Sequence, residues 1–483
     1  MSAAANLRKQ VADLTFAITQ QRQLLTEMEA GLEDLQNQLQ SIVYPILTLP
    51  PEITAEIFLH CLYDEPEDTI ISDVAPLLLT RVCSAWREIA ISTPALWQIF
   101  AVELDSPQEL PNLSQIAQLW LKRAKKCPLS IRICGELVAN DTFHIFIKVL
   151  RRHSQDIQSL ELHLDSEDIE TMDSLLPHGL DLALLESLVI NVPFDEDDDP
   201  AESTALAMFQ NSPVLRIVRL SFAYTSFIVL PWQQLSEFRG QAYTVGACLE
   251  ALRLMPNLLR CAFAAYELNV DEVCEIVVHG CMQHLTLLAE MTDGDEDTLT
   301  SSHVLRFLTL PVLQTLIVER TDYFDADEFD LFLNRSSPPL RKLTVRPIDQ
   351  TMVLHVSPIL LTLDLIELEL WSCDCAFIPR FFEAFSRHHH KLFPHLQRLA
   401  ILDCPSSMAI DTGNCSTIVE VLHLAAEPIA KRRDMSTQSA QLQSFRVTSV
   451  SGGPILPNDL APFRILKEDG LDVCIESWSV SYL

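Results

Sequence analysis

Apolar residues near the start of the chain recur at alternating intervals of four and three. The series consists of Leu7, Val11, Leu14, Ile18, Leu25, Met28, Leu32, Leu35, Leu39 and Ile42. Its one polar member is Gln21. This heptad pattern predicts a coiled-coil helix over residues 1–43, in which Gln21 would cost stability and set the register. The helix could pair with a second copy or fold back on the rest of the chain, and the pattern favours neither arrangement.

A second pattern, over residues 44–105, predicts short helices. Pro50 and Pro51 suit the first turn of a helix, because the N–H groups there have no partner within the helix. Apolar positions then recur at helical spacing in two segments separated by an acidic loop: Ile53, Ile57, Leu78, Val82 and Trp86. Three short helices in about sixty residues bury little surface of their own. Surplus apolar surface on so small a module is typical of a docking site for another protein.

The remaining residues, 106–483, repeat the pattern L-x-x-L-x-L, with other apolar residues allowed. Ten copies begin at Ile157, Leu185, Leu215, Leu258, Met282, Leu313, Leu340, Leu365, Leu396 and Leu442. Most neighbouring copies lie 24 to 31 residues apart, and the two wider gaps hold weaker copies at Leu235 and Val419. Proline often stands two residues before the first position, where it ends a preceding helix and permits an extended start. Each unit is therefore predicted to contain a short strand, a loop and a helix.

Two stretches of this sequence resemble known families. The F-box begins with a Leu-Pro-x-Glu-Ile turn and continues with a Val-Cys-x-x-Trp-Arg helix and an Ala-Leu-Trp-like segment. The corresponding segments here are Leu49–Ile53 ("LPPEI"), Val82–Arg87 ("VCSAWR") and Ala95–Trp97 ("ALW"), with a longer acidic loop than the family has. The spacing of the later copies resembles that of leucine-rich repeats. The open alternatives are an ordinary helical linker domain and an unrelated α/β domain with leucine-rich strands.

The resemblances imply an α/β fold (α+β overall) with three parts. These are a coiled-coil helix over residues 1–43, a small all-α F-box-like module over 44–105, and an irregular leucine-rich-repeat-like solenoid over 106–483. A unit of this size cannot bury its own apolar face, so the copies would have to stack. The family favours Asn or Cys after each strand, and only Cys373 and Cys404 meet that expectation.

F-box modules dock on the Skp adaptor of SCF-type ubiquitin ligases, and through it on cullin. The resemblance therefore implies a substrate-recognition adaptor, not an enzyme, that binds a protein substrate through the repeats. The residues it implies for Skp docking are Leu49, Pro50, Ile53, Ile57, Val82 and Trp86. Candidates for the substrate surface, from strand positions outside the core, are Arg219, Lys342, Arg346, Glu367, Glu369, Trp371 and Arg398. The alternative is a coiled-coil and leucine-rich-repeat scaffold with no link to ubiquitination.

Charge and composition limit the expected binding partners and the expected cellular compartment. The 483 residues carry a formal net charge of −32, which repels nucleic acid and anionic membranes, so neither is an expected partner. No stretch of 18 apolar residues is present, so we expect no membrane span. The 13 cysteines show no disulfide framework and the N-terminus shows no secretory signal. A cytoplasmic or nuclear location is expected.

Motifs for catalysis, cofactors and metals are weak. The chain has only 11 glycines and no G-x-G pair, which disfavours phosphate-binding loops. Histidines at 388–390 and the pair Cys373 and Cys375 lack convergent metal-ligand spacing. We therefore expect no cofactor and no metal, and no residue can be named as catalytic.

Overall fold

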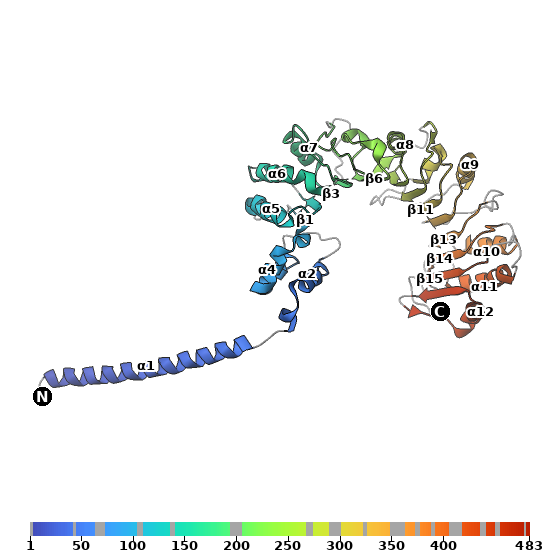
Figure 1. Ribbon diagram of the computed structural model, residues 1–483. Helices are drawn as coiled ribbons and strands as arrows, with labels where there is room; N and C mark the ends of the chain where they lie inside the picture. Colours follow the sequence, from blue (N-terminus) through green and yellow to red (C-terminus); the bar gives the residue numbers. More distant parts are fainter. Residues whose placement is uncertain are drawn as a thin grey trace. The chain divides into compact units, whose positions relative to one another are not determined.

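The structure is a computed structural model, shown in Figure 1. It describes residues 3–41, 45–62, 73–103, 110–135, 141–193, 205–266, 274–288, 301–321, 326–347, 363–371, 377–387, 392–404, 418–434, 441–449, 455–477 and 480–483. Contacts divide the chain into two units, Met1–Leu96 and Trp97–Leu483. A long N-terminal helix is followed by mixed helices and strands, which confirms the α/β class.

The described part of the first unit is helical. Its elements are α1 (Ala3–Ser41), η1 (Pro45–Thr48), α2 (Pro51–Leu59), α3 (Leu77–Val82), α4 (Ser84–Ser92) and η2 (Pro94–Trp97), the last of which ends across the boundary. Helix α2 begins at Pro51, as its proline pair predicts. The Cys83 side chain caps α4 by accepting a hydrogen bond from the Trp86 backbone N–H at 3.5 Å. Phe58 of α2 packs against Trp86 of α4, with ring centroids 4.9 Å apart.

Helix α1 contains the predicted heptad series up to Leu39. Every side chain described in it, over residues 6–38, is exposed, including Leu14, Leu25 and Leu35. Ile42, the last predicted member of the series, lies outside the described residues. The apolar stripe of α1 is therefore open to solvent along the part of the chain that the structure describes.

The second unit is built on one long sheet. Among the described residues it has 15 strands, which follow chain order with β8 and β10 left out and are parallel up to β16; β17 pairs antiparallel with β16. The strands of the first half are β1 (Ile99–Glu103), β2 (Leu129–Cys134), β3 (Ile157–His163), β4 (Ser187–Asn191), β5 (Ile217–Ser221), β6 (Glu237–Thr244) and β7 (Arg260–Tyr266). Those of the second half are β9 (His284–Leu288), β11 (Thr315–Thr321), β12 (Lys342–Pro347), β13 (Glu367–Trp371), β14 (Arg398–Cys404), β15 (Ser444–Ser449), β16 (Asp472–Ser477) and β17 (Val480–Ser481). A separate pair joins β8 (Val277–Val278) to β10 (Leu308–Thr309).

Helices lie along one face of this sheet (Figure 1). The α-helices are α5 (Leu110–Ala124), α6 (Asp141–His153), α7 (Ser166–Ser174), α8 (Val245–Leu254), α9 (Ala326–Ser336), α10 (Phe377–Arg387), α11 (Ile418–Asp434) and α12 (Pro457–Glu468). Shorter turns are η3 (Ser154–Asp156), η4 (Thr225–Phe227), η5 (Trp232–Gln234) and η6 (Ser301–Phe307).

The repeated apolar triplet forms the core between the sheet and the helices. In the copy that begins at Leu185, Leu185, Leu188 and Ile190 are all completely buried. Side chains on a strand alternate between the two faces of the sheet. In each copy, the residues two and four positions after the first one therefore lie on the face opposite to the buried triplet. We call this other face of the sheet the open face.

The ten predicted copies all mark strands. Nine of them begin two residues before a strand, and the copy at Ile157 begins with the strand itself. The weaker copy at Leu235 also precedes a strand, β6. The prediction at Val419 is wrong, because this segment lies in helix α11, where Val421, Leu422 and Ala425 form a buried helical face. Strands β1, β2, β8, β10, β16 and β17 were not predicted.

The boundary between the units differs from the predicted one at residue 105. Strand β1 pairs in parallel with β2, so residues 97–103 belong to the sheet. Trp97 is completely buried and meets the ring of Trp120 at 4.8 Å between centroids. The Trp120 indole N–H also donates a hydrogen bond to the Ile99 carbonyl at 3.0 Å.

Trp120→Ala should destabilise this end of the sheet. Trp120 is 2% exposed, so its removal leaves a cavity and breaks the bond to Ile99; we expect a loss of about 3–5 kcal/mol. Urea denaturation followed by circular dichroism measures this. Leu119→Ala, on the exposed side of the same helix at 55% exposure, is the control and should cost less than about 0.5 kcal/mol. Equal losses in both variants would contradict the assigned packing.

Candidate functional site

The first candidate surface lies on α2 and α3 and consists of two apolar pairs. Ile53 and Ile57 of α2 are 51% and 39% exposed, while the neighbouring Thr54 and Phe58 are buried. In α3, Leu78 and Val82 are likewise 42% and 55% exposed. Residues four apart lie on the same side of a helix, so each helix turns one apolar pair to solvent. We call these four residues the helical docking surface.

The other three residues that the F-box resemblance implies for Skp docking differ from one another in exposure. Pro50 is exposed and Leu49 is half-buried. Trp86 is also half-buried, because one side of its ring packs against Phe58. Trp86 therefore contributes to the packing of the module as well as to its surface.

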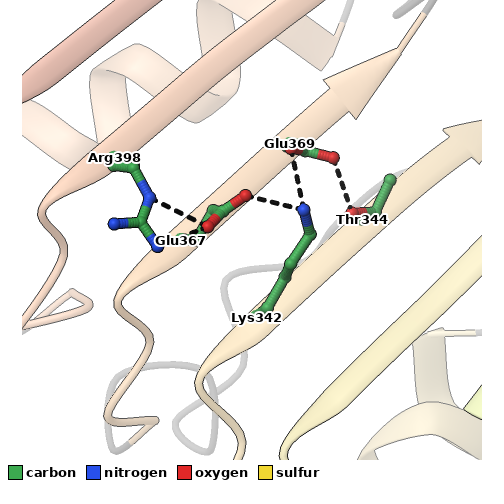
Figure 2. Close-up of polar contacts among 5 residues, drawn as sticks. All are labelled: Lys342, Thr344, Glu367, Glu369 and Arg398. Atoms are coloured by element: carbon green, nitrogen blue, oxygen red, sulfur yellow. Dashed lines mark hydrogen bonds and ion pairs between the residues drawn. The ribbon is translucent and has the colours of Figure 1, made fainter. Parts of the chain in front are cut away.

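The second candidate surface lies on the open face, where neighbouring strands bring charged residues together (Figure 2). Lys342 of β12 donates to Glu367 and Glu369 of β13 at 2.6 and 3.0 Å. Arg398 of β14 donates to the other oxygen of Glu367 at 2.6 and 2.9 Å. Thr344 completes the group by donating its hydroxyl to Glu369 at 2.9 Å. Four of the predicted substrate-surface residues thus form one ion-pair network.

The network keeps its central carboxylate charged. Burial raises the pKa of Glu367, but hydrogen bonds from Lys342 and Arg398 outweigh this effect and lower the pKa to about 2. Burial lowers the pKa of Lys342, and its two glutamate partners reverse that and raise the pKa above its usual value. The charges of the network are satisfied within the sheet, so these side chains have less to offer a ligand.

Of the remaining predicted substrate residues, Arg346 and Trp371 lie farther along β12 and β13, and Arg219 lies apart on β5. Arg346 stacks on the ring of Trp371, with its guanidinium carbon 5.0 Å from the ring centroid, and also lies 3.7 Å from the Asp403 carboxylate. Arg219 lies on β5, and its guanidinium group is 3.9 Å from the Glu237 carboxylate, which is a long distance for an ion pair. The structure therefore gathers six of the seven predicted residues on the adjacent strands β12, β13 and β14 and leaves Arg219 apart.

Two further residues of the open face were missed in the sequence. Arg239 and Arg260 are exposed and lie on β6 and β7, the two strands that follow β5, which carries Arg219. Their signal was available, because Arg239 is four residues after Leu235 and Arg260 is two residues after Leu258. These are the positions of each copy that face away from the core.

Side chains that could bind a metal ion are dispersed over the described residues. There, no group of three or more His, Cys, Asp or Glu side chains is placed to hold a metal ion. His388, His389, His390, Cys373 and Cys375 lie outside the described ranges. Within those ranges, no helix combines the length and the apolar character needed to cross a bilayer.

Comparison with models of protein families finds no match, and comparison with curated proteins finds none either. The chemistry of the two surfaces must therefore be inferred from their own residues.

Glu367→Gln should destabilise the sheet at neutral pH. The substitution removes the charge between Lys342 and Arg398, and for a partly exposed network we expect a loss of about 1–2 kcal/mol. Because the pKa of Glu367 is lowered from 4.5 to about 2, its contribution exists above pH 4.5 and is lost as the pH falls toward 2.

Urea denaturation at pH 7 and at pH values below 4.5 tests this prediction. The control is Glu383→Gln, which breaks an exposed ion pair with Arg387 on α10 and should cost less than about 0.5 kcal/mol at every pH. A loss for Glu367→Gln that stays constant down to low pH would contradict the assigned role of the charge.

Proposed function

We propose that the chain is a substrate-recognition adaptor of an SCF-type ubiquitin ligase. In this proposal the first unit docks on the Skp adaptor and, through it, on cullin. The second unit is a leucine-rich-repeat-like solenoid that holds a protein substrate. The proposal is carried by one observation: a small helical module that resembles the F-box leaves Ile53, Ile57, Leu78 and Val82 exposed.

The exposed pairs suit a protein–protein contact energetically. Fully burying a large aliphatic side chain supplies about 1.5–3 kcal/mol, and these four are 39–55% exposed, so covering each could supply about half of that toward a specific interface, before ordering costs. Ile53 and Val82 lie within the segments that resemble the F-box, "LPPEI" and "VCSAWR", and Ile57 and Leu78 each lie four residues from one of them. Leu49, Pro50 and Trp86 would border this contact.

The sheet supports the second half of the proposal. Its strands follow chain order and pair in parallel, which is the arrangement expected of stacked strand–helix units. Polar and charged side chains on the open face could contact a bound protein segment. Such an adaptor performs no chemistry itself: it raises the effective concentration of a substrate near a ubiquitin-charged enzyme. It would act in the cytoplasm or nucleus.

Ile53→Ala combined with Val82→Ala should abolish co-purification of the Skp adaptor and cullin. Both side chains are more than half exposed, so we expect at least a tenfold weaker affinity with unchanged stability of the chain. Pull-down of the tagged full chain, with thermal unfolding of each variant, measures both effects.

The matched control is Leu331→Ala combined with Ile465→Ala, two similarly exposed apolar residues on α9 and α12. This control should retain the partners. Failure of the wild-type chain to capture the Skp adaptor would refute the proposal and favour the scaffold alternative.

The exposed heptad series of α1 supports a proposal that applies to both the adaptor and the scaffold alternative. Its heptad series remains uncovered along the described helix, and we propose that it pairs with a second copy of the chain. Pairing would make either an adaptor or a scaffold bivalent. A scaffold would use this pairing and the sheet without joining a ligase.

Leu14→Glu combined with Leu25→Glu should convert a dimeric full chain to a monomer. Both leucines belong to the heptad seam, and charges there would repel across the pair. Sedimentation velocity at micromolar concentration measures the state. Phe16→Glu with Thr26→Glu adds the same charge off the seam and should leave the dimer intact. A monomeric wild-type chain would contradict self-pairing.

A further inference from the structure

Three arginines gather on adjacent strands of the open face. Arg219 of β5, Arg239 of β6 and Arg260 of β7 are all exposed. Arg219 and Arg239 are direct partners in the strand register, and Arg260 is opposite Glu237. We call these three residues the arginine patch.

The arginine patch lacks the compensation found elsewhere on the same face. Arg132, Lys342 and Arg398 each reach a carboxylate on a neighbouring strand at 2.6 Å. In the arginine patch, Glu237 approaches only Arg219, at 3.9 Å. Within the described residues, neither Arg239 nor Arg260 makes an ion pair.

The uncompensated positive charge of the arginine patch therefore affects the residues around it. Directly opposed like charges on neighbouring strands are destabilising, and Arg219 and Arg239 are such a pair. Burial lowers the pKa of His284 on the next strand, and the charge of Arg260 lowers it further. In a chain of net charge −32, this local excess of cations is the reverse of the overall balance.

We propose that the arginine patch binds an extended, Asp- and Glu-rich segment of a partner protein. Guanidinium groups pair with carboxylates through two parallel hydrogen bonds, and such a ligand would relieve the repulsion between the arginines. Strands lie about 4.8 Å apart, so the patch spans roughly 10 Å, which about three or four residues of an extended segment cover. The cations are spread over three strands, which suits a row of carboxylates better than one compact anion.

This inference rests on the proposed function, because it names the class of substrate that the second unit would select. It involves none of the residues of the helical docking surface. Loss of acidic-peptide binding and loss of Skp co-purification are therefore separate outcomes.

The test uses the full chain and a fluorescein-labelled peptide of six alternating Asp and Glu residues flanked by Gly-Ser. Fluorescence anisotropy should show saturable binding. Arg239→Gln combined with Arg260→Gln should weaken it at least tenfold, because two charge-assisted contacts are lost. Skp co-purification should be unchanged.

The control is Arg380→Gln combined with Arg464→Gln, two exposed arginines on α10 and α12. It changes the net charge equally and should alter the affinity less than twofold. An equal loss in this control, or no binding by the wild-type chain, would overturn the proposal. So would tighter binding of a Gly-Ser peptide that carries one phosphoserine and no Asp or Glu. Circular dichroism confirms that each variant is folded.

Discussion

The burial of one apolar triplet per strand is the constraint on which the second unit depends. Leu185, Leu188 and Ile190 show the pattern: all three are removed from water between the sheet and the helices. Because side chains on a strand alternate, this burial also determines which residues remain on the open face. The same constraint that builds the core therefore arranges the charged side chains available to a partner.

Much of this fold could be predicted because its signals are local. An apolar triplet with a proline before it indicates both a strand and the face that it buries, and all ten full copies mark strands. The segment at Val419 shows the limit of the pattern. Apolar residues three apart also share a helical face, so the triplet alone does not separate α11 from a strand.

The candidate surfaces could be predicted only in part, because they depend on which strands are neighbours. Glu367 lies 25 residues after Lys342 and 31 residues before Arg398, and only the register shows that these residues satisfy each other's charge. Arg239 was missed because its copy is degenerate. In contrast, Ile53 and Val82 could be identified from short sequence motifs. Each lies on a helix, which places residues four positions apart on the same side.

The two open surfaces differ in how they could distinguish partners. The helical docking surface is apolar, so shape and exclusion of water would govern its contacts. The arginine patch would act through charge and would weaken as salt increases. A chain that combines them could hold a constant partner at one unit while its affinity for a variable partner responds to ionic conditions.

Strand β17 affects how another chain could add to this end of the sheet. A parallel sheet with an open edge offers a template on which another chain can polymerise. Here β17 turns back against β16 and consists of only two residues, Val480 and Ser481. This short reversed strand pairs with Glu476 and Ser477 at the end of β16 and interrupts the parallel ladder there, so a foreign strand could not continue the ladder in parallel along the whole of β16.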